Sequence, residues 1–266
     1  MVQINEIMFR KYIYLFFLPI VLLNACSQKE EIDKYLSAVW NSPSGGSINY
    51  LYRSPDKLEK DKKYPMLFFL HGAGGRGLDN KGQLLDANSI TAFKSHRLFS
   101  NYDSYVFAGQ VPEGERWVNV DWSSSAHQMP VISNSLKNIF EALDTFINDY
   151  NNQVDVDRIY IMGLSMGGYG TWDAIQRRPD FFAAAVPICG GGDRSIANLL
   201  TKIPIWSWHG DQDRVISAAR SRDMDNAIKK SGGSPKYTEV KGRGHDVWLD
   251  VWKSDDLWKW LYSQSR

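Results

Sequence analysis

The chain is poor in cysteine, in clustered charge of one sign and in long apolar runs. Two of its 266 residues are cysteines, and 31 basic residues stand against 30 acidic ones, for a formal charge of +1. Two cysteines are too few for a disulfide framework, and balanced charge gives no electrostatic basis for binding nucleic acid. The five histidines are scattered, without an H-E-x-x-H or paired C-x-x-C motif, so we expect neither a metal nor an organic cofactor.

The chain contains enough apolar residues to form the core of one large domain. Hydrophobic residues make up 43% of the chain and aromatic residues 13%, and the length suits a single α/β domain. Short apolar segments alternate with amphipathic ones, which is typical of βαβ units and a parallel sheet. We predict an α/β fold with a mostly parallel central sheet, helices on both faces and functional residues at the carboxyl ends of the strands.

Hydrophobic periodicity locates the individual elements. Apolar or alternating segments predict strands at 48–52, 64–70, 104–108, 159–162, 182–190, 203–208 and 236–240. Amphipathic segments predict helices at 133–150, 169–176, 217–230 and 250–262. The helix over 133–150 has the clearest pattern, one continuous apolar stripe, and we expect it to serve packing alone.

The N-terminal segment has the features of a targeting signal. Arg10 and Lys11 precede an apolar run over residues 12–23, which is too short to cross a bilayer but suits a signal peptide. The run ends at Leu23-Asn-Ala-Cys26, which resembles a bacterial lipobox, where cleavage leaves a lipidated cysteine. An ordinary cleaved signal peptide with a spare cysteine is the alternative.

This interpretation divides the chain into three parts. We expect a lipoprotein signal peptide over residues 1–25, a polar tether over 26–39 and one catalytic domain over 40–266. The expected location is the outer membrane of a Gram-negative bacterium, on its periplasmic or its cell-surface side, with the lipid on Cys26 as the membrane anchor.

The most informative stretch is Gly163-Leu-Ser165-Met-Gly167, which fits the pattern G-x-S-x-G. It follows the apolar run 159–162 and precedes a segment with helical character. A strand, a tight turn and a helix in this order lift a serine hydroxyl clear of the sheet edge. We therefore predict Ser165 as a nucleophile. A glycine-rich turn that matches by chance is the alternative.

A serine nucleophile needs a base and an acid, which in this arrangement follow it in the order acid, then histidine. One histidine, His245, lies downstream of both Ser165 and the pair Asp211 and Asp213. We predict His245 as the general base and Asp213 as the acid that orients it. Asp211 is the rival acid, with a role in the turn as its expected function.

A glycine-rich loop follows the predicted strand over 64–70. Gly72-Ala-Gly-Gly-Arg-Gly77 fits the dinucleotide fingerprint G-x-G-x-x-G, but the acidic residue expected about 20 residues later is missing. The alternative is a loop whose backbone amides face the nucleophile. We favour this second interpretation and expect the oxyanion to be bound by the N–H of Met166 and by that of Ala73 or Gly74.

Long irregular segments inside a compact domain are usually functional or disordered, and one such segment covers residues 109–127. It is rich in polar and aromatic residues. We expect it to form part of a substrate pocket, together with the turn that follows His245. The expected pocket residues are Gln110, Trp117, Trp122 and Trp248.

Together these motifs resemble the α/β-hydrolase superfamily, in its esterase or "predicted peptidase" branch. The resemblance is carried by residues 70–80, the turn over 163–172, His209-Gly-Asp-Gln-Asp213 and Gly244-His245. Feruloyl esterases, acetyl-xylan esterases and prolyl-oligopeptidase-like proteins belong to this branch. The resemblance implies a serine hydrolase with Ser165, Asp213 and His245 as its triad.

From the triad and the resemblance we expect a serine carboxylesterase that works through an acyl-enzyme. The expected partner is a small-molecule or oligosaccharide ester, with acyl groups on polysaccharides as the substrate class. One alternative is a small peptidase or amidase. The other is a surface lipoprotein that binds glycans without catalysis.

Overall fold

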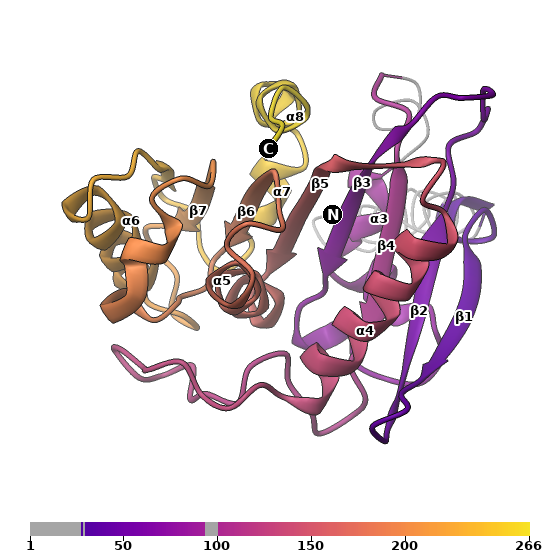
Figure 1. The fold of residues 1–266 in the computed structure, drawn as a ribbon. Coiled ribbons are helices and arrows are strands. Elements are labelled where there is room, and N and C mark those ends of the chain that lie inside the picture. The colour runs from indigo at the N-terminus through magenta and orange to yellow at the C-terminus, as the bar shows by residue number, and fades with distance from the viewer. Residues whose placement is uncertain (1–27, 29, 94–100) are drawn as a thin grey trace, which may run out of the picture.

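The computed structural model describes residue 28 and residues 30–93 and 101–266, so the predicted signal peptide and Cys26 lie outside it. The chain forms an eight-stranded sheet in the order β1-β2-β4-β3-β5-β6-β7-β8 (Figure 1). Strand pairing is antiparallel across β1, β2 and β4 and parallel from β4 to β8. The strands are β1 (Leu36–Asn41), β2 (Ser47–Arg53), β3 (Tyr64–Leu70), β4 (Tyr105–Gln110), β5 (Val154–Leu164), β6 (Ala184–Ile188), β7 (Trp206–Gly210) and β8 (Lys236–Val240).

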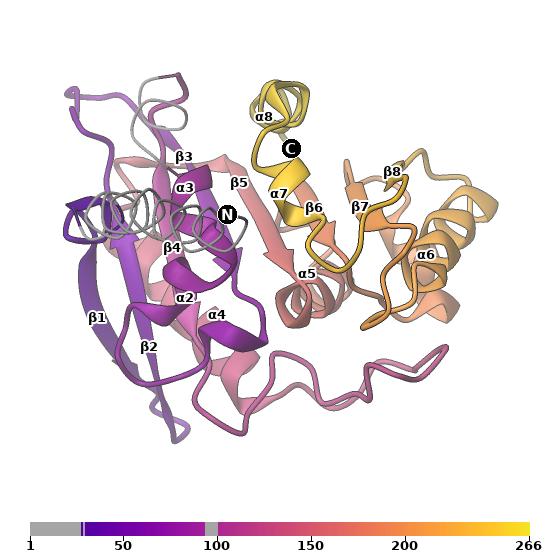
Figure 2. The same ribbon diagram turned by 180° about the vertical axis from the view of Figure 1, so that it is seen from behind.

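Helices cover both faces of this sheet. On the face toward the viewer in Figure 1 lie α4 (Asn134–Asp149), α5 (Met166–Arg177) and α6 (Ala219–Lys230). The other face, seen in Figure 2, carries α2 (Gly82–Leu85), α3 (Ser89–Ala92), α7 (Trp248–Val251) and α8 (Asp255–Tyr262). Short 3₁₀ turns complete the chain: η1 (Ala73–Gly75), η2 (Asp86–Asn88) and η3 (Arg194–Leu200). This arrangement confirms the predicted fold class.

Strand β1 corrects the expected domain boundary. Leu36 pairs with Tyr52 of β2, so the sheet begins inside the segment expected to be a tether over 26–39. Ile32 and Tyr35 are each only 5% exposed and belong to the core. The folded domain therefore starts before residue 40. The sequence pattern did not predict β1, because this edge strand is largely exposed and lacks the apolar run of a buried strand.

Most other elements lie where the periodicity places them, and β3 and β8 have the predicted bounds. The expected helix over 250–262 is instead two helices, α7 and α8. The side chain of Ser254 accepts a hydrogen bond from the N–H of Leu257 at 3.2 Å and so caps a new helix. Among the described residues, no helix combines the length and apolar character that crossing a membrane requires.

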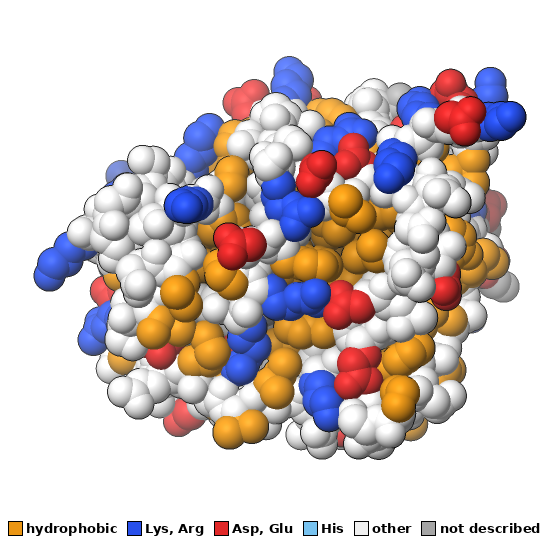
Figure 3. All heavy atoms as spheres, viewed as in Figure 1, with side chains coloured by type: hydrophobic (Ala, Val, Ile, Leu, Met, Phe, Trp, Pro, Cys, Tyr) orange, Lys and Arg blue, Asp and Glu red, His pale blue; other side chains and the backbone are white. Residues whose placement is uncertain are grey.

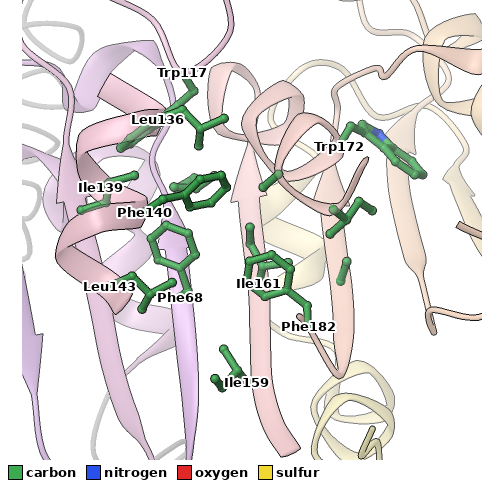
Figure 4. Packing of buried hydrophobic residues seen from close by; sticks show 14 of the residues in the cluster. Phe68, Trp117, Leu136, Ile139, Phe140, Leu143, Ile159, Ile161, Trp172 and Phe182 are labelled. Atoms are coloured by element: carbon green, nitrogen blue, oxygen red, sulfur yellow. The ribbon is translucent and has the colours of Figure 1, made fainter. Parts of the chain in front are cut away.

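The core has two parts, one on each face of the sheet. On the face of α4 and α5, Leu136, Ile139 and Leu143 of α4 lie close to Phe68 of β3 (Figure 4). The apolar stripe predicted for this helix is thus its packing face. On the surface seen in Figure 3, basic and acidic side chains are interspersed, as the nearly balanced composition suggests. The sheet is held rigidly on both sides, which fixes the loops at its carboxyl edge.

Candidate active site

Ser165 occupies a sharp turn between β5 and α5. Its backbone adopts φ 54° and ψ −116°, a conformation that non-glycine residues rarely adopt. A Cβ at Gly163 would lie 2.3 Å from the carbonyl oxygen of Gly167, and one at Gly167 would lie 1.9 Å from that of Leu70. Both positions therefore require glycine. The strained turn is the one that the G-x-S-x-G pattern predicts.

The structure brings the three predicted triad residues into one hydrogen-bonded chain. Ser165 Oγ lies 2.9 Å from His245 Nε2, and His245 Nδ1 lies 2.7 Å from Asp213 Oδ2. They come from three neighbouring parts of the carboxyl edge: the β5–α5 turn and the loops after β7 and β8. The rival acid, Asp211, accepts a hydrogen bond from the N–H of Gly242 at 2.6 Å. Asp213, not Asp211, faces the imidazole.

The surroundings of Asp213 keep its carboxylate ionised. Its side chain is fully buried, and Oδ1 accepts hydrogen bonds from the N–H groups of Val215 at 2.8 Å and Ile216 at 2.9 Å. Burial opposes the charge, but hydrogen bonds from His209, His245 and the Ile216 amide outweigh it and hold the pKa of Asp213 far below its usual value. A permanently charged acid stabilises the imidazolium that forms when His245 takes a proton.

His209 is the second histidine on this carboxylate. It is fully buried, with Nε2 at 2.9 Å from the carbonyl oxygen of Ile216 and 3.2 Å from Asp213 Oδ2. A carbonyl only accepts, so Nε2 carries a proton and can also donate to the carboxylate. Nδ1 lies 2.8 Å from the hydroxyl of Ser221. His209 therefore positions the acid.

The expected oxyanion donors lie where β3 ends and α5 begins. Met166 is the first residue of α5, and the first N–H groups of a helix have no acceptor within it. Ala73 and Gly74 open the turn η1 after β3. The N–H of Gly75 is already bonded to the carbonyl of Gly72 at 3.2 Å, which leaves the amides of Ala73 and Gly74 as candidates. The positive end of the α5 dipole also favours an anion here.

The turn η1 also argues against the interpretation of the glycine-rich loop as a dinucleotide-binding site. In a dinucleotide-binding fold, the glycine fingerprint opens a helix whose N-terminus holds the pyrophosphate. Here only the three-residue turn η1 follows β3. Gly72 and Gly74 are needed for another reason, because added Cβ atoms would lie 2.9 Å and 2.5 Å from the carboxylate oxygens of Asp86. No sequence motif indicated that Asp86 lies against this loop, because Asp86 and the glycines belong to separate turns.

His71 holds the oxyanion loop against β4. It is fully buried, and Nε2 accepts a hydrogen bond from the N–H of Val111 at 2.9 Å. Nδ1 therefore carries the proton and donates to the carbonyl of Gly72 at 2.5 Å. Burial lowers the pKa of His71 to about 4, so this imidazole is neutral. Its role is structural, because it fixes the backbone of the loop after β3.

Two of the four expected pocket residues are corrected. Gln110 is 1% exposed and braces the loop after β3: Nε2 donates to the carbonyl of Gly75 at 3.1 Å and Oε1 accepts from the N–H of Asn80 at 2.7 Å. Trp117 is fully buried, and its indole N–H donates to the carbonyl of His71 at 3.1 Å. Buried side chains with their polar atoms already bonded cannot line an open pocket.

The other two tryptophans are partly exposed. The ring of Trp248 packs edge-on against His245, with centroids 5.4 Å apart. The ring of Trp122 lies under the guanidinium of Arg116 at 4.5 Å, and its carbonyl accepts from the hydroxyl of Tyr169 at 3.4 Å. Trp248 thus lies against the triad, whereas the pocket role of Trp122 stays a prediction.

Cys189 completes a group with potential metal-ligand atoms. Its thiol, His245 and Asp213 offer ligand atoms within 4.8 Å of one another. The two latter groups, however, are bonded to each other, and burial, together with the charge of Asp213, raises the pKa of the Cys189 thiol. A neutral thiol is a poor ligand. The arrangement therefore fits a serine–histidine–aspartate triad better than a metal site.

Comparison with known proteins identifies the class. Residues 57–254 match the phospholipase/carboxylesterase family, and the chain belongs to this α/β-hydrolase family. A solved thermostable esterase is 34% identical, with a TM-score of 0.80 over 88% of this chain and 64% of its own. Fold and family together define an esterase-like hydrolase.

Two further relatives are named for particular esters. Feruloyl esterase D of Neurospora crassa is 22% identical over 207 residues, 74% of this chain and 64% of that protein. The bifunctional acetylxylan esterase/xylanase XynS20E of Neocallimastix patriciarum is 29% identical over 79 residues, 30% of this chain and 12% of that protein. The chain spans less than two thirds of the length of each of these relatives and of the thermostable esterase.

Proposed function

We propose that the protein is a serine carboxylesterase in which Ser165 is acylated by the substrate. The observation that carries the proposal is the chain of hydrogen bonds from Ser165 Oγ through His245 to Asp213, at 2.9 Å and 2.7 Å. These distances are those of a nucleophile and base within hydrogen-bond reach, with a third group that orients the base. The carboxylesterase family supports the same reaction class.

The geometry supports a two-stage reaction. Ser165 Oγ attacks the ester carbonyl while His245 Nε2 takes its proton, and the resulting oxyanion is bound by the N–H of Met166 and that of Ala73 or Gly74. His245 then protonates the alcohol oxygen as the C–O bond breaks, which leaves an acyl-enzyme. Water, deprotonated by His245, attacks the acyl carbonyl, and Ser165 leaves with the proton. No group beyond the chain and water is required.

For the substrate we propose acyl esters of polysaccharides or oligosaccharides. Two relatives are named as feruloyl and acetylxylan esterases, which is the support from similarity. The partly exposed Trp248, whose ring packs against His245, is the support from structure, because aromatic rings pack well on sugars and aromatic acyl groups. A peptidase or amidase activity remains the alternative for the same triad.

The proposal is tested with p-nitrophenyl acetate and a fluorophosphonate probe. We expect wild type to hydrolyse the ester and to be labelled, and Ser165→Ala to do neither, with a rate loss of at least about 10³-fold. Ser263→Ala is the matched control, because that residue is exposed and its hydroxyl bonds to residues near it in the chain, donating to the carbonyl of Trp260 and accepting from the side chain of Gln264. If the folded wild-type protein neither hydrolyses the ester nor reacts with the probe, the proposed esterase activity is disproved. Faster cleavage of matched anilides would favour an amidase.

For the location we propose a cell-envelope lipoprotein of the outer membrane, anchored through Cys26. The support is the sequence pattern alone, a basic pair, an apolar run and a lipobox-like end at Cys26. Membrane fractionation of cells that express the full chain tests this. Release of the protein into the soluble fraction without detergent would contradict the anchor.

A further inference from the structure

Arg220, near the start of α6, is a buried cation that has no counter-ion in the part of the chain that the structure describes. It is only 4% exposed, and among residues 30–93 and 101–266 no carboxylate lies within ion-pair distance of its guanidinium. Its Nε is buried and has no hydrogen-bond partner among the described residues. Arg53, which is buried as well, pairs with Glu31 at 3.1 Å and with Asp56 at 2.5 Å. Buried arginines are ordinarily paired in this way.

The two side chains in contact with the guanidinium of Arg220, those of His127 and Tyr169, are neutral. The nearest carboxylate that acts on His127, that of Asp193, lies beyond ion-pair distance of Arg220. Nη2 is hydrogen-bonded to His127 Nδ1, which must therefore be unprotonated. Burial and the nearby positive charge of Arg220 lower the pKa of His127 to about 4. The guanidinium also lies 5.6 Å from the ring centroid of Tyr169. An imidazole and a phenol solvate the cation without cancelling its charge.

One member of this cluster, Tyr169, stands on the first turn of α5, directly after the nucleophile. Tyr169 lies one helical turn after Ser165, and its N–H donates to the carbonyl of Ser165 at 3.1 Å. Gly191 lies just beyond β6 and against the side chain of Arg220. A Cβ at this position would lie 2.6 Å from Arg220 Nε, so the close approach of the guanidinium requires glycine here. The segment between β4 and α4, which carries His127, runs along the carboxyl edge below α5 toward α6 (Figures 1 and 2). The Ser165 turn and Arg220 thus share one edge of the sheet.

We propose that Arg220, with His127 and Tyr169 beside it, forms a subsite for a carboxylate carried by the substrate. This proposal rests on the esterase function proposed above and narrows it to acidic esters. An isolated charge is costly to bury, and an anion that enters with the substrate offsets that cost. A carboxylate suits the site because the guanidinium presents a planar fork of N–H donors that matches it. A uronic acid in an acylated oligosaccharide is one group of this class.

The test uses two matched ester pairs. In one, the carboxylate is on the acyl side: p-nitrophenyl hydrogen glutarate against p-nitrophenyl valerate. In the other, it is on the alcohol side: 4-acetoxybenzoate against its methyl ester. We expect wild type to prefer the charged member of one pair, and Arg220→Met to lose about tenfold or more in kcat/KM on that member only. The pair that responds shows on which side of the scissile bond the carboxylate binds.

Two further variants make the result decisive. Arg220→Lys keeps the charge but not the fork, so an intermediate loss is expected. Arg222→Met is the matched control on the same helix, because Arg222 is exposed and paired with Glu239 at 2.6 Å, and it should leave the preference unchanged. An equal loss on charged and neutral esters in Arg220→Met would overturn the subsite and leave Arg220 as a purely structural residue.

If Arg220→Met does not fold, wild type alone still decides the matter. A preference for the charged ester that weakens as salt is raised supports the subsite, whereas no preference in either pair refutes it. Hydrolysis of the neutral esters in that case would leave the proposed esterase function intact. Failure on all four esters would refute the esterase function instead.

Discussion

The two flanks of Ser165 use the same dipeptide for different purposes. On the oxyanion flank, His71-Gly72 follows β3, and on the acid flank, His209-Gly210 ends β7. Both imidazoles are fully buried, and both bond to the backbone of the loop that follows. From the sequence they are indistinguishable.

Their surroundings differ in charge. The hydrogen bonds of His71 go to backbone groups, from Val111 and to Gly72, so it positions amides. His209 lies 3.2 Å from the carboxylate of Asp213 and helps to hold that charge. On the oxyanion flank a neutral imidazole therefore holds the backbone in place, whereas on the acid flank the imidazole stabilises an ion. Substitutions on the two flanks should therefore change different measurements.

The largest effect is expected for Asp213→Asn, which removes the ion while keeping the shape. The amide can no longer stabilise the imidazolium of His245 or hold its productive tautomer, so kcat should fall by about 10³- to 10⁴-fold with little change in KM. Steady-state kinetics on p-nitrophenyl acetate measure this. Asp211→Asn is the control and should stay within about tenfold of wild type. The reverse ranking would show that Asp211 is the acid.

A smaller effect is expected from His209, which positions the acid. His209→Asn can replace Nδ1 but not Nε2, so Asp213 loses a donor, and kcat should fall about tenfold. His209→Gln can place an amide donor near the former Nε2 and should recover most of that loss. Equal kcat values for the two variants would mean that His209 acts only by filling space. A circular-dichroism melt of each variant checks that the fold is retained.

An effect of another kind, on stability and not on kcat, is expected on the oxyanion flank. The pKa of His71 is about 4 in the folded protein against 6.5 for an ordinary histidine. Between these pH values the unfolded chain binds a proton that the folded chain does not, so acidification lowers the free energy of unfolding by up to about 1.4 kcal/mol per pH unit. His71→Gln keeps an acceptor for Val111 and cannot titrate. Urea unfolding from pH 7 to 4.5 should show a shallower decline for the variant; identical slopes would contradict this account.

Much of this molecule follows from patterns local in sequence. The strand over 64–70, the turn around Ser165 and the long helix before it carry their signals within a few residues, because backbone sterics and burial on one face act locally. Strand β1 was missed because its largely exposed pattern resembles a polar tether. The prediction that Gln110 and Trp117 line a pocket was wrong, because both are buried. Residue type alone does not distinguish a position in a pocket from one in the core.

Local spacing and chain order were enough to predict the fold class, the G-x-S-x-G turn at Ser165 and the choice of Asp213 and His245 as acid and base. The tertiary structure added the contact between Asp213 and the imidazole, the different roles of His71 and His209, and the absence of a counter-ion for Arg220 among the described residues. The physical reason is distance. Hydrogen bonds and desolvation act over a few ångströms in space, and residues dozens of positions apart meet at those distances only after the sheet has formed.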